Sequence, residues 1–148
     1  MALSSKVTWK DGMAFEAAIG EHTFTIDAGA DVGGRGLGPA PKALTLTSLV
    51  GCTGMDVIAI VRKMKLVDRI TSFVVEADGE LSDNHPKRYT DITVYYRFEG
   101  DPSLPHDRLL RAVELSEDRY CGVSATLKPQ VELHSVVTLN GEPISPGA

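Results

Sequence analysis

Two cysteines are the residues of this 148-residue chain best suited to chemistry. Cys52 lies in an apolar stretch beside Gly51 and Gly54, and Cys121 lies in the segment YCGVSAT at an expected helix boundary. A thiolate that meets a peroxide becomes a sulfenic acid, and a nearby second thiol converts that acid to a disulfide. Arg35, in the loop before the apolar stretch, is a cation that could lower a thiol pKa and so activate the thiol. In the simpler alternative each cysteine is a small buried hydrophobe and Arg35 is solvated.

The composition argues against several other kinds of protein. A net charge of −5 disfavours nucleic-acid binding, which requires a basic surface. The sequence also lacks the basic amphipathic stretch that is typical of proteins bound to a membrane surface. The first residues, MALSSKVTWKDG, lack the apolar run of a secretory signal. We therefore expect a cytoplasmic protein with neither nucleic acid nor membrane among its partners.

Metal and cofactor motifs are also missing from the sequence. The two cysteines lie far apart, and the histidines do not cluster: they are His22, His85, His106 and His134. The glycine-rich loop 27–38 contains GGRG but has neither the P-loop pattern nor the dinucleotide fingerprint. The expectation is a protein without metal or cofactor.

A long helix over residues 39–65 is the element that must position Cys52. Prolines are tolerated in a first helical turn, and cations are favoured in a last one, where Arg62 and Lys63 stand. The stretch is apolar on every side, so we predict a nearly all-buried helix covered by protein or by lipid. Asp56 makes lipid the weaker option. Gly51 and Gly54 serve either close helix packing or the approach of backbone or substrate to the thiol, and both remain open.

The other elements predict a single α+β domain over residues 1–148. Tyr95 and Tyr96 are adjacent in a strand, so at most one of them is in the core. We expect His85 to be exposed in a polar loop. The expected elements are a meander of strands (7–9, 13–19, 22–26), an antiparallel hairpin (70–77, 89–98), a helix (106–120), a strand (131–139) and a loose tail (140–148).

Two long motifs carry a family resemblance. The segment GPAPKALTLTSLVGCTGMDVIAIVRKMK and the later RAVELSEDRYCGVSATL resemble the OsmC/Ohr family (osmotically inducible protein C and organic hydroperoxide resistance), in particular its small OsmC-like branch. The resemblance covers most of the chain, since the expected strand order also fits. It implies antiparallel sheets wrapped around a long central cysteine-bearing helix in an intertwined homodimer, which would explain a helix that is apolar all round.

The resemblance also implies an activity, the thiol-dependent reduction of organic hydroperoxides recycled by a cellular dithiol. By match of motif, Cys52 is the peroxide-attacking thiol and Cys121 the resolving thiol, while Arg35 would stabilise the thiolate and orient the peroxide. An apolar helix wall would favour alkyl peroxides: Leu49, Met55 and Ile58.

One departure from the family pattern leaves a second function open. Many members carry a glutamate, which fixes the active-site arginine, where this chain has Ala43. Arg35 would then need another orienting group, for which Asp56, one turn after Cys52, is a candidate. The alternative to an enzyme is therefore a non-catalytic OsmC-like protein that binds a small hydrophobic ligand at its dimer interface.

Overall fold

The computed structural model describes residues 1–147 of the chain. The chain forms two compact units, Met1–Thr45 and the remainder from Leu46 onward. The longest helix, α1 (Pro41–Lys63), runs across the boundary between them.

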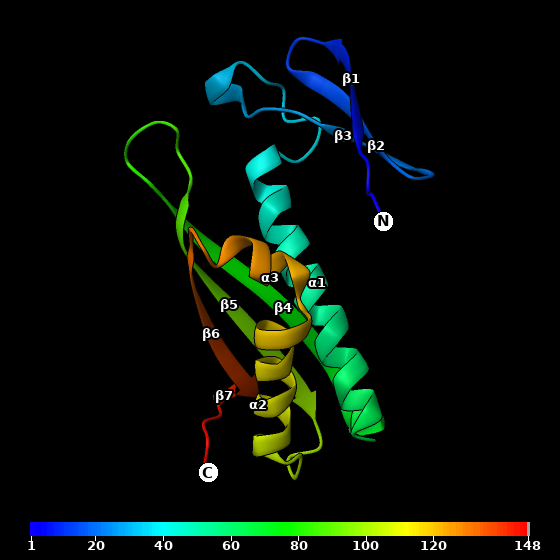
Figure 1. Ribbon diagram of the computed structural model, residues 1–148, viewed down its shortest axis with the longest axis vertical. Coiled ribbons are helices and arrows are strands. Elements are labelled where there is room, and N and C mark those ends of the chain that lie inside the picture. Colours follow the sequence, from blue (N-terminus) through cyan, green and yellow to red (C-terminus); the bar gives the residue numbers. More distant parts are fainter. Residues whose placement is uncertain (148) are drawn as a thin grey trace. The chain divides into compact units, whose positions relative to one another are not determined.

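The first unit contains a three-stranded antiparallel sheet in the order β1–β2–β3 (Figure 1). Its strands are β1 (Lys6–Asp11), β2 (Ala14–Ile19) and β3 (His22–Ile26). The turns pass through Gly12 and Gly20, whose φ values of 53° and 59° lie in the left-handed region that favours glycine. The predicted N-terminal meander is confirmed.

The glycine-rich loop that follows is organised around a buried carboxylate. Asp27 is 3% exposed and accepts hydrogen bonds from the backbone N–H groups of Ala28, Arg35 and Leu37 at 2.7, 3.2 and 3.2 Å. Burial alone would raise the pKa of Asp27, but these bonds and the Arg35 charge outweigh it and lower the pKa. The loop also contains a 3₁₀ turn, Ala30–Val32.

Two glycines of this loop are required by close backbone approach. A Cβ at Gly34 would lie 1.9 Å from the carbonyl oxygen of Ala28, and one at Gly38 would lie 2.0 Å from that of Thr25. No side chain fits at such distances. Glycine at these two positions therefore allows the loop to pack closely against β3 and against the first residues of the loop itself.

Helix α1 is buried along one stripe only. Leu49, Thr53, Val57 and Val61 recur every four residues and are buried, whereas Met55 is 76% exposed. The prediction of a nearly all-buried helix is therefore wrong for the single chain. By length and composition α1 could also cross a membrane, but core helices of soluble proteins meet the same criteria. Its buried stripe belongs to the hydrophobic core of the second unit.

The second unit contains a four-stranded sheet in the order β4–β5–β6–β7. Its strands are β4 (Ile70–Leu81), β5 (Tyr89–Gly100), β6 (Glu132–Leu139) and β7 (Glu142–Pro143), and a 3₁₀ turn, Val67–Arg69, precedes β4. The predicted hairpin is confirmed as β4 and β5, which extend beyond the predicted ends. Alternate β5 side chains enter the core: Ile92, Val94, Tyr96 and Phe98. Tyr96 is thus the buried one of the two tyrosines.

Two expectations for this sheet are corrected. The pairing of β5 with β6 is parallel, because the chain between them crosses back through helices and returns in the same direction. The tail is not loose throughout: β7 pairs with β6, and Ile144 is buried and donates its N–H to the Val137 carbonyl at 3.0 Å. Residue 148 lies outside the described residues.

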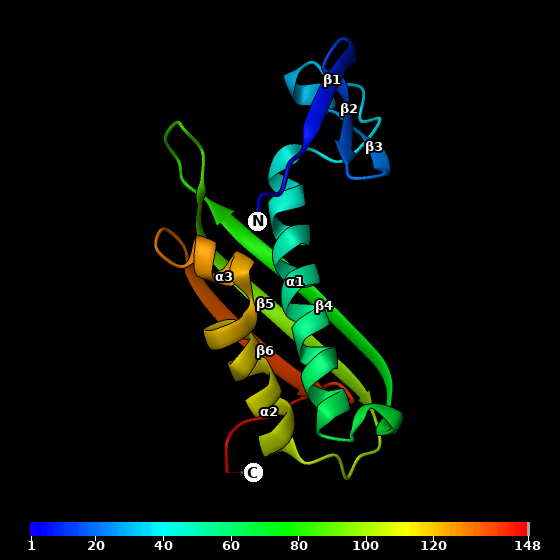
Figure 2. The ribbon, with the colours of Figure 1, turned by 45° about the vertical axis from the view of Figure 1, so that its right-hand side comes forward.

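The crossover between β5 and β6 consists of α2 (His106–Leu115), a π-helical turn (Ser116–Tyr120) and α3 (Gly122–Leu127). In Figures 1 and 2, α1, α2 and α3 lie on the same face of the β4–β5–β6 sheet. The predicted helix 106–120 is confirmed as α2 and its π-helical turn, whereas α3 was not predicted. The core lies between these helices and the sheet.

Candidate active site

The structure brings the two cysteines together inside the second unit. The Sγ atoms of Cys52 and Cys121 and a carboxylate oxygen of Asp56 all lie within 4.8 Å of one another. Cys52 and Asp56 are four residues apart on α1 and therefore share a face of the helix. Both thiols are free. A sulfenic acid formed on either sulfur would have the other thiol beside it.

Cys121 is held at the start of α3 by the turn before it. Its N–H donates to the Ser116 carbonyl at 2.8 Å, and its Sγ accepts from the N–H of Ser124 at 3.4 Å. The side chain is buried, and burial raises the pKa of Cys121 despite the two bonds that involve Ser124; nearby Cys52 raises it further. The helix start thus does not activate this thiol, because its raised pKa favours the protonated form.

Cys52 is half-buried, and its two neighbouring glycines differ. A Cβ at Gly54 would lie 3.4 Å from the Val75 side chain of β4, whereas a Cβ at Gly51 would meet open space. Gly54 therefore serves packing within the chain. Gly51 leaves the helix surface beside Cys52 clear. The other interpretation of these glycines, that backbone or substrate approaches the thiol, therefore remains open for Gly51.

The predicted apolar wall is only partly available beside this thiol. Leu49 is 1% exposed and belongs to the core, so it cannot contact a substrate. Ile58 is half-buried and Met55 is exposed. The expectation is thus wrong for Leu49.

Arg35 lies in the first unit, where its guanidinium pairs with the carboxylate of Asp11 (the Nη2–Oδ1 contact). Both side chains are more than half exposed, so the pair contributes little to stability. Its backbone N–H is held by Asp27. Asp11 is thus the carboxylate that orients Arg35 within this unit, and its predicted pairing with Asp56 remains a prediction.

A buried chain of polar side chains, which the sequence analysis missed, lies next to the thiols. Ser116 Oγ contacts Asp56 Oδ2 at 3.3 Å and Thr53 Oγ1 at 2.7 Å. Thr53 Oγ1 contacts the Tyr96 hydroxyl at 2.9 Å, and that hydroxyl donates to Glu117 Oε1 at 2.8 Å. Burial, followed by the Glu117 charge, raises the pKa of Tyr96 far above its usual range. In the sequence, only the four-residue spacing of Cys52 and Asp56 gave a signal for this row of polar side chains.

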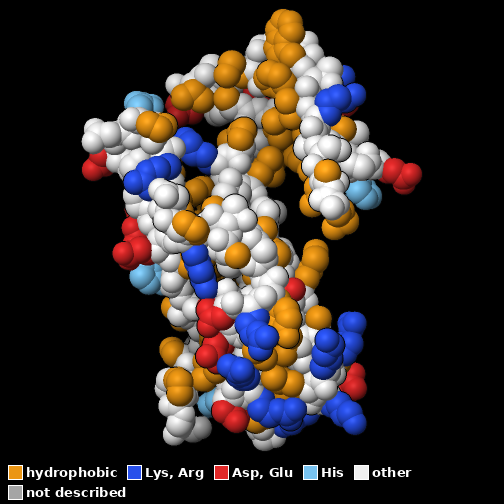
Figure 3. All heavy atoms as spheres, in the orientation of Figure 1, with side chains coloured by type: hydrophobic (Ala, Val, Ile, Leu, Met, Phe, Trp, Pro, Cys, Tyr) orange, Lys and Arg blue, Asp and Glu red, His pale blue; other side chains and the backbone are white. Residues whose placement is uncertain are grey.

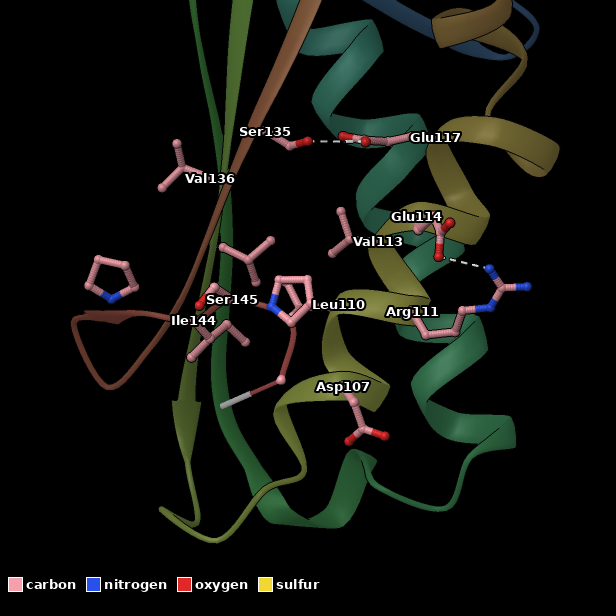
Figure 4. A pocket seen from close by; sticks show the side chains of 14 residues that line it. Asp107, Leu110, Arg111, Val113, Glu114, Glu117, Ser135, Val136, Ile144 and Ser145 are labelled. Atoms are coloured by element: carbon pink, nitrogen blue, oxygen red, sulfur yellow. Dashed lines mark hydrogen bonds and ion pairs between the residues drawn. The ribbon is translucent and has the colours of Figure 1, made fainter.

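A surface groove lies at the Glu117 end of this row of polar side chains. A cavity of about 700 Å³ lies between α2 and the β6–β7 hairpin, and Glu117 and Ser135 line it. Figure 4 shows the Glu117 carboxylate in this groove, where it accepts a hydrogen bond from Ser135 at 3.1 Å.

Two groups among the described residues have the spacing to hold a metal ion. The set formed by Cys52, Asp56 and Cys121 falls one short of the four ligands of a closed structural zinc site. A second group, Asp91, Glu132 and His134, lies at the partly exposed pairing of β5 and β6. Exposed acidic groups of this kind are common without an ion.

Taken together, two sheets and a long helix that brings one thiol beside another define a small α+β dithiol protein. A family model described as "OsmC-like protein" matches residues 33–135, so this chain belongs to the OsmC-like protein family. The resemblance to OsmC/Ohr proteins and the mixed α+β fold are thereby confirmed.

Individual proteins are similar to this chain over most of its length. Protein YhfA of Escherichia coli strain K12 is 27% identical over 133 residues, which cover 88% of this chain and 93% of that protein. A hypothetical protein from Aquifex aeolicus aligns with a TM-score of 0.77 and 25% identity over 95% of this chain and 98% of its own. An organic hydroperoxide resistance protein from Elizabethkingia anophelis aligns with a TM-score of 0.72 and 13% identity over 95% of this chain and 97% of its own, a likeness of fold alone.

Proposed function

We propose that this protein is a thiol-dependent peroxidase that reduces organic hydroperoxides through Cys52 and Cys121. The carrying observation is the thiol pair, two sulfurs from distant parts of the chain within 4.8 Å of each other. Family membership supports the same chemistry, since solved relatives are described as organic hydroperoxide resistance proteins.

The two cysteines take different roles in this proposal. The Cys52 thiolate attacks the distal peroxide oxygen; an S–O bond forms, the O–O bond breaks, and the leaving alkoxide takes a proton to become an alcohol. Cys121 then attacks the sulfenic sulfur, forming the S–S bond and releasing water. A cellular dithiol reduces the disulfide and becomes a disulfide itself. The half-buried thiol is the one a peroxide can reach, whereas the buried, protonated Cys121 suits the resolving role.

Arg35 is proposed to stabilise the Cys52 thiolate and orient the peroxide. A guanidinium close to a thiolate lowers the thiol pKa and so increases the reactive fraction. The pair with Asp11 gives Arg35 a carboxylate partner, although this chain lacks the glutamate that many family members carry.

We further propose a cytoplasmic homodimer. The β1–β2–β3 sheet exposes large apolar side chains, among them Val7, Trp9 and Ile19, and Figure 3 shows hydrophobic side chains gathered over it. Helix α1 adds exposed Met55. Large apolar side chains exposed on one sheet indicate an interaction site, and a second copy of the chain is the occupant that the resemblance implies.

The experiment is a turnover assay with cumene hydroperoxide and a dithiol. The wild type should produce cumyl alcohol catalytically and should prefer this substrate to hydrogen peroxide. Cys52→Ser should be inactive at any dithiol concentration. Wild-type protein with no turnover and two unreactive thiols would reject the proposal.

A non-catalytic binding protein is the competing function. An apolar cavity of about 230 Å³ in the first unit, lined in part by Met13, Phe15 and Ile26, is the observation in its favour. Thiols that persist unchanged after peroxide treatment, together with retention of a hydrophobic ligand, would support this alternative.

A further inference from the structure

We infer that Asp56, Ser116, Thr53, Tyr96 and Glu117 form a proton relay that connects the thiol pair to the surface groove. This inference rests on the proposed peroxidase function and adds the source of the proton that the leaving alkoxide needs. The five groups, here named the hydroxyl relay, come from α1, β5 and the π-helical turn.

The relay is continuous, and its three hydroxyl groups are enclosed. Its links, in order from Asp56 to Glu117, measure 3.3, 2.7, 2.9 and 2.8 Å. Thr53, Ser116 and Tyr96 are each fully buried, so water does not replace their mutual contacts. A further, longer contact of Ser116 Oγ goes to the Thr53 carbonyl at 3.4 Å.

The relay has more oxygen–oxygen contacts than hydroxyl protons. Four oxygen–oxygen contacts need one proton each, and the hydroxyls of Ser116, Thr53 and Tyr96 supply three. If Asp56 and Glu117 were both ionised, one contact would join two oxygens with no proton between them. A contact left without a proton among the buried hydroxyls of Ser116, Thr53 and Tyr96 is costly. The relay is complete when it holds one extra proton, on either terminal carboxyl.

The two placements of that proton differ only in the direction of the hydroxyls. With Glu117 ionised, the hydroxyls point from Ser116 toward Glu117 and the proton is on Asp56, near both sulfurs. With Asp56 ionised, all three hydroxyls reverse and the proton is on Glu117, in the groove of Figure 4. A concerted reversal therefore moves one proton between solvent and the thiol pair.

The reaction uses this proton in its first step. The Cys52 thiolate forms the S–O bond, the O–O bond breaks, and the alkoxide takes the Asp56 proton to leave as an alcohol. Glu117 gains a proton from water in the groove, and reversal of the hydroxyls restores the proton on Asp56. Asp56 is the group that meets the reacting atoms; Ser116, Thr53 and Tyr96 act through it as positioning residues.

The kinetic test measures single-turnover oxidation of Cys52 by cumene hydroperoxide. Thr53→Val and Tyr96→Phe remove a hydroxyl each, leave both carboxyls ionised, and should slow the reaction on the order of a hundredfold, within the usual range for general acid catalysis. The double variant should be no slower than either single one, because the same proton is lost. Thr53→Ser should restore the rate, and Tyr95→Phe, which removes the neighbouring tyrosine hydroxyl, should leave it unchanged. Multiplicative losses in the double variant would overturn the relay.

A second readout does not depend on peroxide. The reduced wild type should show, at neutral pH, the infrared C=O stretch of one protonated carboxyl that disappears in Thr53→Val and persists in Thr53→Ser. An identical carboxyl band in wild type and Thr53→Val would overturn the relay even if the enzyme is active. Wild-type protein inert to hydroperoxide but with the expected band would instead reject the peroxidase function and retain the relay.

Discussion

At the scale of residues, the two cysteines have different environments and therefore different expected roles. Cys52 is half-buried on α1 beside open space at Gly51. Cys121 is buried at the start of α3, and burial holds its pKa above the usual range. A thiol that stays protonated is a poor first nucleophile but can attack an adjacent sulfenic acid once its proton is removed.

The first prediction follows from this difference. Hydroperoxide treatment of Cys121→Ser should leave a stable sulfenic acid on Cys52, because no second thiol is near enough to condense with it. Mass spectrometry after dimedone labelling should place one adduct on Cys52. The reciprocal variant, Cys52→Ser, should show little labelling; a strong Cys121 adduct there would reverse the two roles.

A second prediction concerns the buried carboxylate of Asp27, which should stabilise the loop in a pH-dependent way. Its pKa is lowered in the folded state, so its carboxylate stabilises the fold above the unfolded-state pKa of about 3.9, and this contribution is lost as the pH falls through the folded-state value. Asp27→Asn should lower the melting temperature at pH 7, and the difference from wild type should shrink below about pH 4. Asp31→Asn, in the same loop, is the control. A difference that does not change with pH would contradict the assignment.

At the scale of elements, the junction between loop and helix decides whether Arg35 contributes to catalysis. Ala43 lies in the first turns of α1, and Arg35 lies in the loop before it, both in the first unit. A carboxylate at position 43 would offer the guanidinium a bidentate partner, which adds geometry as well as energy.

The corresponding prediction is a gain of function. Ala43→Glu should raise turnover about tenfold, equivalent to about 1.4 kcal/mol of transition-state stabilisation. Arg35→Ala should abolish that gain. A four-variant cycle of wild type, both single variants and the double variant measures the coupling. The same gain with and without Arg35 would remove Arg35 from the catalytic set.

The elements also show what sequence patterns could and could not predict. The meander, the hairpin of β4 and β5 and the long cysteine helix follow from local periodicity and turn residues. The β6–β7 hairpin had a usable signal, because Asn140-Gly141 is a favoured two-residue turn and both residues adopt positive φ. The hydroxyl relay had almost none, since Thr53, Tyr96 and Ser116 meet only when α1, β5 and the crossover pack together.

At the scale of the whole molecule, the exposed apolar surface is the main unexplained feature of the single chain. Trp9 is 63% exposed and Met55 is 76% exposed. The helix that the sequence predicts to be covered all round is covered on one stripe only within the chain. The proposed homodimer would account for both observations.

The prediction at this scale concerns association. Sedimentation at micromolar concentration should give a dimer for the wild type. Met55→Glu should weaken association, because it adds a charge to an apolar contact surface, whereas Met55→Leu, which retains an apolar side chain, should not. A stable, well-folded wild-type monomer would contradict the homodimer.

The most direct test of the peroxidase function is a thiol titration of the reduced wild type before and after one equivalent of cumene hydroperoxide. We expect that both thiols of each chain disappear, that one equivalent of cumyl alcohol forms, and that peptide mapping finds a Cys52–Cys121 disulfide within the chain. Two thiols that still titrate after this treatment, with the hydroperoxide recovered intact, would contradict it.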